Sequence, residues 1–305
     1  MPFLGAVPAR WRGVILMIVS TMFVTAMQAT IRKVGQDVHP FEVAFFRNFF
    51  GLIIVLPLLY RAGFGILRTS QLKLHAVRGV LQTGGMLLFF TALTLAPLAQ
   101  TVALSFTAPL FTAVLAILIL RERADWQRWT ALIGGLVGAW VVIRPGFAEV
   151  NIGTWFVILS SCTWGTTMII IKYLGRTESS LTITVYMGLF MAPLSAIPAA
   201  FVWQWPATGD FLLLVLVGCL GGLAHLLLAQ AFKEAEAGAI LPFDFLRLIW
   251  ASAIGFLLFA EVPDAWTWIG GAVIFGATTY MAIREARHRQ RKPVDEDAAT
   301  SVRPR

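Results

Sequence analysis

The sequence predicts an all-α polytopic membrane protein, with ten transmembrane helices arranged as two inverted five-helix repeats. Composition, the spacing of apolar runs and an internal repeat lead to this prediction. Of the 305 residues, 58% are hydrophobic and 13% are charged, whereas a soluble domain carries about 25% charged residues. One soluble core could not bury so much apolar surface, but lipid allows that surface to face outward.

Apolar runs recur along the chain, close to the ~20 residues that a helix needs to cross the hydrocarbon core. Inside lipid the backbone must satisfy its own hydrogen bonds, so these runs are expected to be helices. Short alternating segments typical of a β-barrel do not occur. The expected spans are 13–31, 40–60, 74–95, 99–120, 126–143, 151–172, 180–203, 210–232, 237–260 and 265–283.

Positive charge flanks these runs and favours alternate loops. With a cytoplasmic N-terminus, the outer loops hold only Arg32, Lys33 and Arg144. The inner segments hold Arg10, Arg12, Arg61, Arg68, Lys73, Arg121, Arg123, Arg128, Lys172, Arg176 and Lys233. This bias predicts a multi-pass protein of the bacterial inner membrane with both termini cytoplasmic. The net charge of +8 is therefore explained by the orientation of the protein in the bilayer, and no nucleic-acid partner is expected.

One ungapped register covers most of each half. Glu122 and Glu261 lie 139 positions apart, as do Asp125 and Asp264, and each Glu-x-x-Asp stretch follows a fourth span and precedes a fifth. Five spans are an odd number, so the second copy must be inverted, as in many secondary transporters. The expected segments are a cytoplasmic N-terminus (1–12), two repeats (13–146 and 150–283) and a disordered cytoplasmic tail (284–305).

Several short motifs resemble the EamA type of the drug/metabolite transporter superfamily, and a subset of it that includes riboflavin and S-adenosylmethionine uptake carriers. They are 46–51 (FRNFFG), 75–79 (HAVRG), 89–93 (FFTAL), 97–99 (PLA), 104–111 (LSFTAPLF), 120–123 (LRER), 128–129 (RW), 144–146 (RPG), 242–248 (PFDFLRL) and Glu261. The resemblance extends over about residues 13–283.

This resemblance implies a secondary transporter that moves a small organic metabolite by alternating access. The sequence has no G-x-x-x-x-G-K-[ST] loop, in agreement with transport without ATP hydrolysis. The candidate solutes are riboflavin or another flat vitamin or nucleoside-like metabolite. An exporter of amino acids or drugs and a carrier of S-adenosylmethionine remain the alternatives.

Charged residues inside spans are the first site candidates, because a charge at mid-membrane costs at least about 2.5–3.5 kcal/mol and usually faces a partner or a cavity. Asp244 and Arg247 share a helix face at i, i+3. They form either a structural ion pair or part of the substrate pathway. A more specific form of the second hypothesis makes Asp244 a proton carrier. Arg47, Arg78 and Gln82 are assigned to the pathway or to helix anchoring.

Other candidates follow from polarity, ring size or backbone chemistry. Pro109 and Pro242 interrupt the fourth span of each half and predict hinges or kinks. Near Pro109, Ser105 and Thr107 either satisfy freed carbonyls or face the solute. Trp164 and Trp250 lie inside spans and either form walls for a flat solute or pack against lipid. His225 acts either as a proton relay or as a hydrogen-bonded packing residue.

Two other classes of membrane protein are compatible with this composition. A membrane-embedded enzyme would need a nucleophile–base set or a metal cluster within the spans, and the sequence offers neither, so no catalytic residue, metal or cofactor is expected. A membrane receptor would bind a solute without moving it. Import or export, a proton as the coupling ion, and a homodimer are left open.

Overall fold

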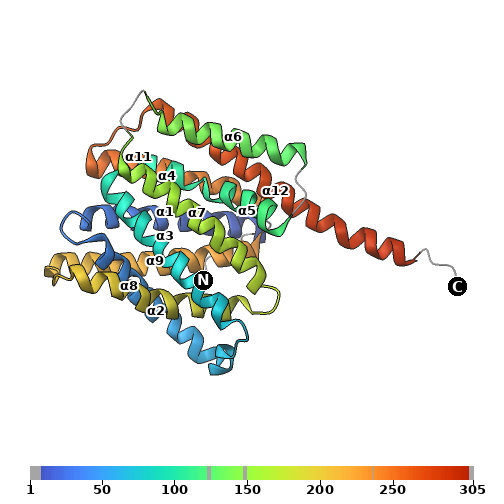
Figure 1. The fold of residues 1–305 in the computed structure, drawn as a ribbon, viewed down its shortest axis with the longest axis horizontal. Coiled ribbons are helices and arrows are strands. Elements are labelled where there is room, and N and C mark those ends of the chain that lie inside the picture. Colours follow the sequence, from blue (N-terminus) through green and yellow to red (C-terminus); the bar gives the residue numbers. More distant parts are fainter. Residues whose placement is uncertain (1–7, 122–124, 147–149, 236, 302–305) are drawn as a thin grey trace.

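The computed structural model describes residues 8–121, 125–146, 150–235 and 237–301, and the elements of this part of the chain are helices (Figure 1). Two helices are interrupted, and counting each as one gives ten helices. The uninterrupted ones are α1 (Ala9–Val34), α2 (Pro40–Ala62), α3 (Leu72–Leu95), α6 (Trp126–Ile143), α7 (Ile152–Leu174), α8 (Ser180–Val202), α9 (Thr208–Glu234) and α12 (Ala265–Ser301).

The interrupted helices are the fourth of each half. The first consists of α4 (Leu98–Ser105) and α5 (Ala108–Leu120). The second consists of α10 (Ala237–Ile240), the 3-10 segment η3 (Leu241–Phe245) and α11 (Leu246–Phe259), and a short 3-10 turn, η2 (Phe64–Leu67), joins α2 to α3.

Seven helical segments of the described chain are long and apolar enough to cross a membrane. Helices α2, α6 and α12 complete the bundle: α2 packs on α8 and α9, and α6 packs on α12. The predicted class, an all-helical polytopic membrane protein, is confirmed.

Side-chain caps explain where several helices begin. Asn151 Oδ1 accepts a hydrogen bond from Gly153 N at the start of α7, and Ser179 Oγ accepts one from Thr182 N at the start of α8. These bonds satisfy backbone donors that the first turn of a helix leaves free. The polar residues that separate the apolar runs therefore also fix the helix starts.

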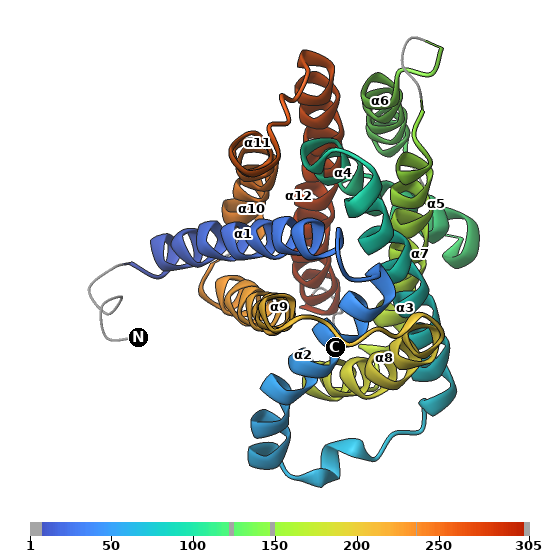
Figure 2. The same cartoon turned by 90° about the vertical axis from the view of Figure 1, so that its left-hand side faces the viewer.

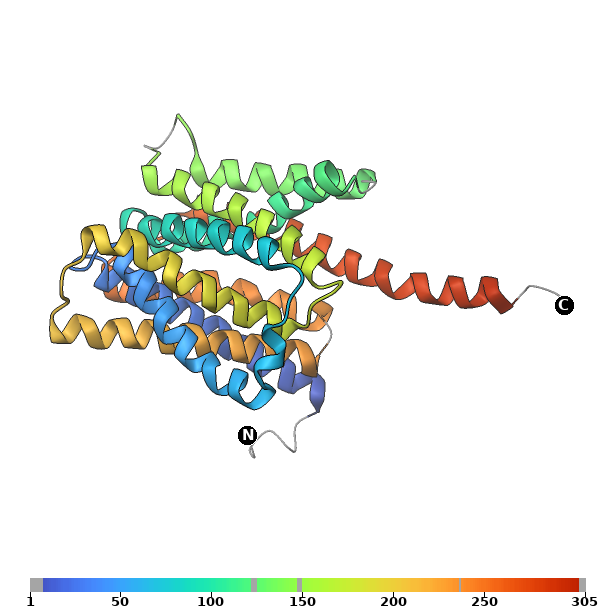
Figure 3. The ribbon, with the colours of Figure 1, turned by 60° about the horizontal axis from the view of Figure 1, so that its bottom comes forward.

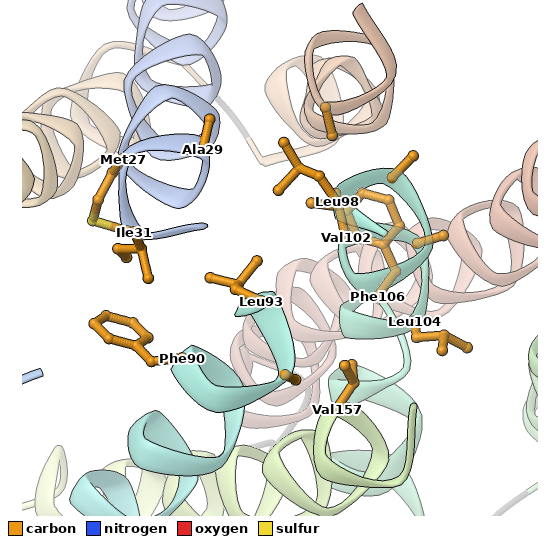
Figure 4. Packing of buried hydrophobic residues seen from close by; sticks show 14 of the residues in the cluster. Met27, Ala29, Ile31, Phe90, Leu93, Leu98, Val102, Leu104, Phe106 and Val157 are labelled. Carbon is orange, nitrogen blue, oxygen red and sulfur yellow. The ribbon is translucent and has the colours of Figure 1, made fainter. Parts of the chain in front are cut away.

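The helix contacts follow a two-fold pattern. Helix α1 packs on α9, and its counterpart in the second half, α7, packs on α3. Equivalent helices also pair with each other, α2 with α8 and α6 with α12. Helices of one repeat therefore pack mainly on helices of the other. The core lies between the repeats, where α1, α3, α4 and α7 meet around Leu93, Leu98 and Val157 (Figure 4).

Two ion pairs show that the halves are inverted. Arg144, at the end of α6, pairs with Asp264 before α12, and Arg284 in α12 pairs with Asp125 before α6. Helices α6 and α12 are therefore antiparallel, which confirms the predicted inverted repeats. Of the Glu-x-x-Asp stretches, Glu122 lies outside the described residues.

The C-terminal segment differs from expectation. Residues 284–301, expected to be disordered, continue α12 as a helix that leaves the bundle (Figure 1). Residues 284–292, before Pro293, are Arg, Glu, Ala, Gln and Lys apart from one His, and these five have high helix propensity; adding residues to an existing helix also avoids the cost of nucleation. Figure 3 shows α1 beginning and α12 leaving at the same end of the bundle.

Candidate functional site

The two interrupted helices meet where the repeats adjoin. Phe106 follows α4, and Phe245 lies in η3; they are 139 positions apart, and their rings stack with centroids 6.4 Å apart. Residues that correspond between the repeats thus contact each other, which places this junction on the pseudo-two-fold axis. Figure 2 views the region with α1, α4 and α11 around it. Secondary carriers often bind solute at such interrupted helices.

Proline and hydroxyl side chains account for the first interruption. Pro109 occupies the first turn of α5, where its missing N–H costs no helical hydrogen bond. The hydroxyls of Ser105 and Thr107 donate to the carbonyls of Val102 and Leu104, each at 2.7 Å. Pro242 lies in η3, at the corresponding interruption of the second half.

The second half brings a charged pair to the junction, and the corresponding positions of the first half are uncharged. Arg247 Nη1 lies 3.4 Å from Asp244 Oδ2, and the side chains keep 20% and 28% of their surface exposed. The Arg247 guanidinium also lies 5.4 Å from the centre of the Phe106 ring. At the positions 139 residues earlier stand Ser105 and Ala108. The junction is therefore electrostatically asymmetric.

A second polar group lies between α2 and α9. Arg47 donates to Asn48 Oδ1 at 3.0 Å, and Asn48 donates in turn to Ser195 Oγ at 3.1 Å. No carboxylate in the described part of the chain pairs with Arg47. Gly221 lies beside the guanidinium: a Cβ there would be 3.5 Å from Arg47 Nε, an ordinary contact, but only 2.8 Å from Met27 Sδ. His225 Nδ1 is bonded to the carbonyl of the same glycine at 2.9 Å, so Arg47 and His225 converge on Gly221.

Arg78 and Gln82 form a third group, between α3 and α8. Arg78 donates to the carbonyl of Ile183 at 2.9 Å, and Gln82 Nε2 lies 3.2 Å from Met187 Sδ. The two-fold relates this group to the second one. Helices α3 and α9 correspond at an offset of 139, but α2 and α8 correspond at 140, because Gly79 meets Phe190 where Gly218 meets Phe50. Gln82 therefore corresponds to Gly221, and Met187 to Arg47. The sequence candidates are thus distributed over three places.

The two candidate tryptophans lie on different helices. Trp164 of α7 is 51% exposed. Trp250 lies one turn beyond Arg247 on α11, and its buried Nε1 has no hydrogen-bond partner in the described part of the chain. The two indoles make no ring contact with each other there. Trp250 is therefore the one positioned near the junction.

Sequence reasoning missed the rings at the axis. Phe106 and Phe245 looked like ordinary apolar residues, and their 139-residue separation was the available signal. Within the described ranges, no three His, Cys, Asp or Glu side chains gather in a way that could hold a metal ion.

Two inverted five-helix repeats, with interrupted helices meeting at a polar junction, define the architecture of a secondary membrane transporter. The particular family follows from comparison with known proteins. The chain belongs to the EamA-like transporter family, whose model matches residues 11–144 and 151–283, one copy in each half.

Named relatives in this family are transporters. The chain is 31% identical to the S-adenosylmethionine uptake transporter of Rickettsia felis, over 92% of this chain and 95% of that protein. It is 33% identical to the riboflavin transporter of Brucella anthropi, over 78% and 86% of the two chains. A crystal structure with 18% identity covers 90% of this chain and 98% of its own, with a TM-score of 0.60, and shows the shared fold.

Proposed function

We propose that this transporter moves a metabolite with a flat heteroaromatic ring, by alternating access around the junction of α4/α5 with η3/α11. The observation that carries the proposal is the Asp244–Arg247 pair on the pseudo-two-fold axis, beside two stacked phenylalanine rings. A solute bound there contacts both repeats, so rocking of one repeat against the other would expose it to each side in turn.

The chemistry of the junction favours a zwitterionic solute. The Asp244 carboxylate can pair with an ammonium group, and the Arg247 guanidinium can donate two parallel hydrogen bonds to a carboxylate. The rings of Phe106 and Phe245 can receive a cation or a flat base. S-adenosylmethionine carries an amino-acid group, a sulfonium and an adenine ring, and the R. felis relative is named as its uptake transporter.

Riboflavin is the second candidate. It is flat and carries no ammonium group, so it would use the aromatic surfaces and the hydrogen-bonding capacity of Arg247, but not the Asp244 charge. The B. anthropi relative, named a riboflavin transporter, supports this alternative.

Uptake into proteoliposomes tests both solutes. If S-adenosylmethionine is carried, Asp244→Asn and Arg247→Gln should each raise its KM about 10- to 100-fold, since a hydrogen bond to a charged group contributes about 1.5–3 kcal/mol. If riboflavin is carried, Asp244→Asn should leave its KM close to wild type, and Phe106→Leu should raise it.

Asp210→Asn, in the first turn of α9, and Lys33→Gln, at the end of α1, are matched charge-removing controls away from the junction. Both should transport like wild type. Folded wild-type protein that moves neither solute would refute the proposed solute class, and unchanged kinetics in both junction variants would refute the site.

A further inference from the structure

One face of α3 holds polar side chains that are pressed into the bundle. His75, Arg78 and Thr83 are 2%, 4% and 4% exposed, and Gln82 lies on the same side, one turn beyond Arg78. Tyr186, Ile183 and Met187 of α8 face them. We call this contact between α3 and α8 the polar seam.

Many polar atoms of the polar seam have no hydrogen-bond partner among the described residues. They are both ring nitrogens of His75, Nε of Arg78, Oε1 of Gln82 and Oγ1 of Thr83. Burying polar groups without partners is costly, and native proteins rarely do so without a functional reason. The polar seam therefore has more hydrogen-bonding capacity than its own packing uses.

The fold does not require this polarity. In the equivalent contact between α9 and α2, an offset of 139 places Leu214 where His75 stands and Val217 where Arg78 stands, and both are fully buried. The close packing itself is kept, because Gly79 meets Phe190 in one contact and Gly218 meets Phe50 in the other. Apolar residues can build the same contact, so the polar residues point to a task beyond packing.

The polar seam ends under the linker between α2 and α3. Thr69 of this linker donates to Glu178 in the turn between α7 and α8, and Tyr186 donates to the carbonyl of Leu67 at 2.7 Å. Figure 2 shows the linker along the lower edge of the bundle. His75 stacks on Tyr186, with ring centres 4.4 Å apart. The imidazole of His75 therefore contacts the Tyr186 ring, whose hydroxyl holds the linker between α2 and α3.

Few ionisable groups surround His75. Glu178, from the turn before α8, and Arg78, one turn further along α3, interact with its ring electrostatically. Tyr186 is the titratable group that α8 presents to it, and the linker contributes Arg68, which is exposed. A proton on His75 would be attracted by Glu178 and repelled by Arg78.

The opposite end of the bundle has a similar fastening. There Glu42 accepts a hydrogen bond from Gln204 N at 3.2 Å, in the linker between α8 and α9. Phe46, the counterpart of Tyr186 at an offset of 140, packs its ring on Trp203 of that linker. The contacts of Glu42 with Gln204 and of Phe46 with Trp203 do not themselves use a histidine side chain, although His39, the cap of α2, lies one turn before Glu42.

We propose that the polar seam carries the proton that couples this transporter, with His75 as the group that binds it. The inference goes beyond the identity of the solute and rests on the proposed function only in taking the protein as a carrier.

In the proton-loading step, a proton from bulk water associates with the Glu178 carboxylate and moves to one ring nitrogen of neutral His75. Glu178 is thereby left ionised and His75 becomes an imidazolium. The positive charge on His75 attracts the Glu178 carboxylate. Glu178 then gives up its hydrogen bond from Thr69, which weakens the attachment of the linker between α2 and α3. Return of the proton from His75 to water, on the side then open, restores the neutral ring and the fastening.

Two measurements test this proposal. In the first, liposomes enclosing a pH-sensitive dye contain wild type, His75→Gln or the control His288→Gln, and receive S-adenosylmethionine or riboflavin in separate runs. Wild type and the control should move protons with the solute. His75→Gln should move none and should not accumulate solute against its gradient, but it should still exchange solute at equal pH.

The second measurement needs no solute. Nuclear magnetic resonance of histidine-labelled protein, recorded between about pH 5 and 8 and with the His75 signal identified by its absence in His75→Gln, should show the ring gaining a proton as the pH falls. If His75→Gln fails to exchange solute, Glu178→Gln serves as the second variant, because its amide can still bond Thr69; it should slow proton movement and retain exchange.

A His75 signal that stays neutral across this range, or a His75→Gln variant that moves protons like wild type, would overturn the proposal. If wild type carries neither solute, the solute assignment fails, and the titration still decides the role of His75.

Discussion

At the scale of single residues, two glycines set how closely the halves approach. A Cβ on Gly79 would lie 2.6 Å from Phe190 Cβ, and one on Gly218 would lie 2.4 Å from Phe50 Cβ. Such contacts matter in lipid, where helices associate through close packing rather than through the hydrophobic effect. Because the two glycines correspond in the two repeats, the same contact is made twice.

We predict that Gly79→Ala and Gly218→Ala each destabilise the protein by about 1–3 kcal/mol, the usual cost of overpacking. Gly84→Ala, on the same helix as Gly79 and with no atom within 4 Å of its new Cβ, is the matched control. It should be neutral or stabilising by up to about 1 kcal/mol, because Ala favours helix over Gly. Thermal unfolding in detergent measures the difference; equal midpoints for Gly79→Ala and Gly84→Ala would contradict the packing argument.

At the scale of elements, Asp125 and Asp264 each do two things at the start of their helices. Asp264 Oδ1 accepts from Thr267 N at 2.8 Å and Asp125 Oδ1 from Arg128 N at 3.1 Å, so both cap a helix. Each also forms an ion pair with an arginine of the other half of the chain, Asp264 with Arg144 and Asp125 with Arg284. This double use explains why an aspartate follows the fourth helix of each half.

Substitutions separate the two roles. Asp264→Asn removes the ion pair but can keep the cap, and the carboxylate side chain is 39% exposed, so we expect a loss of at most about 1 kcal/mol. Asp264→Ala also removes the cap and should cost about 1 kcal/mol more. Unfolding of the two variants, with Asp125→Asn and Asp125→Ala in parallel, measures both. Equal stabilities for the Asn and Ala variants would exclude a capping role.

At the scale of the whole molecule, the two ends of the bundle differ in charge. Both termini emerge at one end (Figure 3), and the positively charged loop residues of the sequence lie mostly on the side of the N-terminus. Positive loops stay in the cytoplasm, so we expect both termini there. A C-terminal green fluorescent protein fusion should be fluorescent in bacteria, and a C-terminal alkaline phosphatase fusion should be inactive. The opposite result would reverse the assignment.

Much of the architecture was predictable from the sequence. A chain with 13% charged residues and recurrent apolar runs has few stable forms in lipid, since the backbone must pair with itself. Five spans per copy then force the second copy to be inverted. Asp244 and Arg247 could be placed on one helix face because their spacing alone determines it.

Only the tertiary structure decided which polar residues lie close together. Arg47, Arg78 and Asp244 looked alike in the sequence, as charges inside spans, yet they lie in three different contacts. Local spacing specifies which way a side chain leaves its own helix, but the helix that faces it is decided by how the repeats dock. The stacking of His75 on Tyr186 joins residues from opposite halves, and for that physical reason only the folded bundle revealed it.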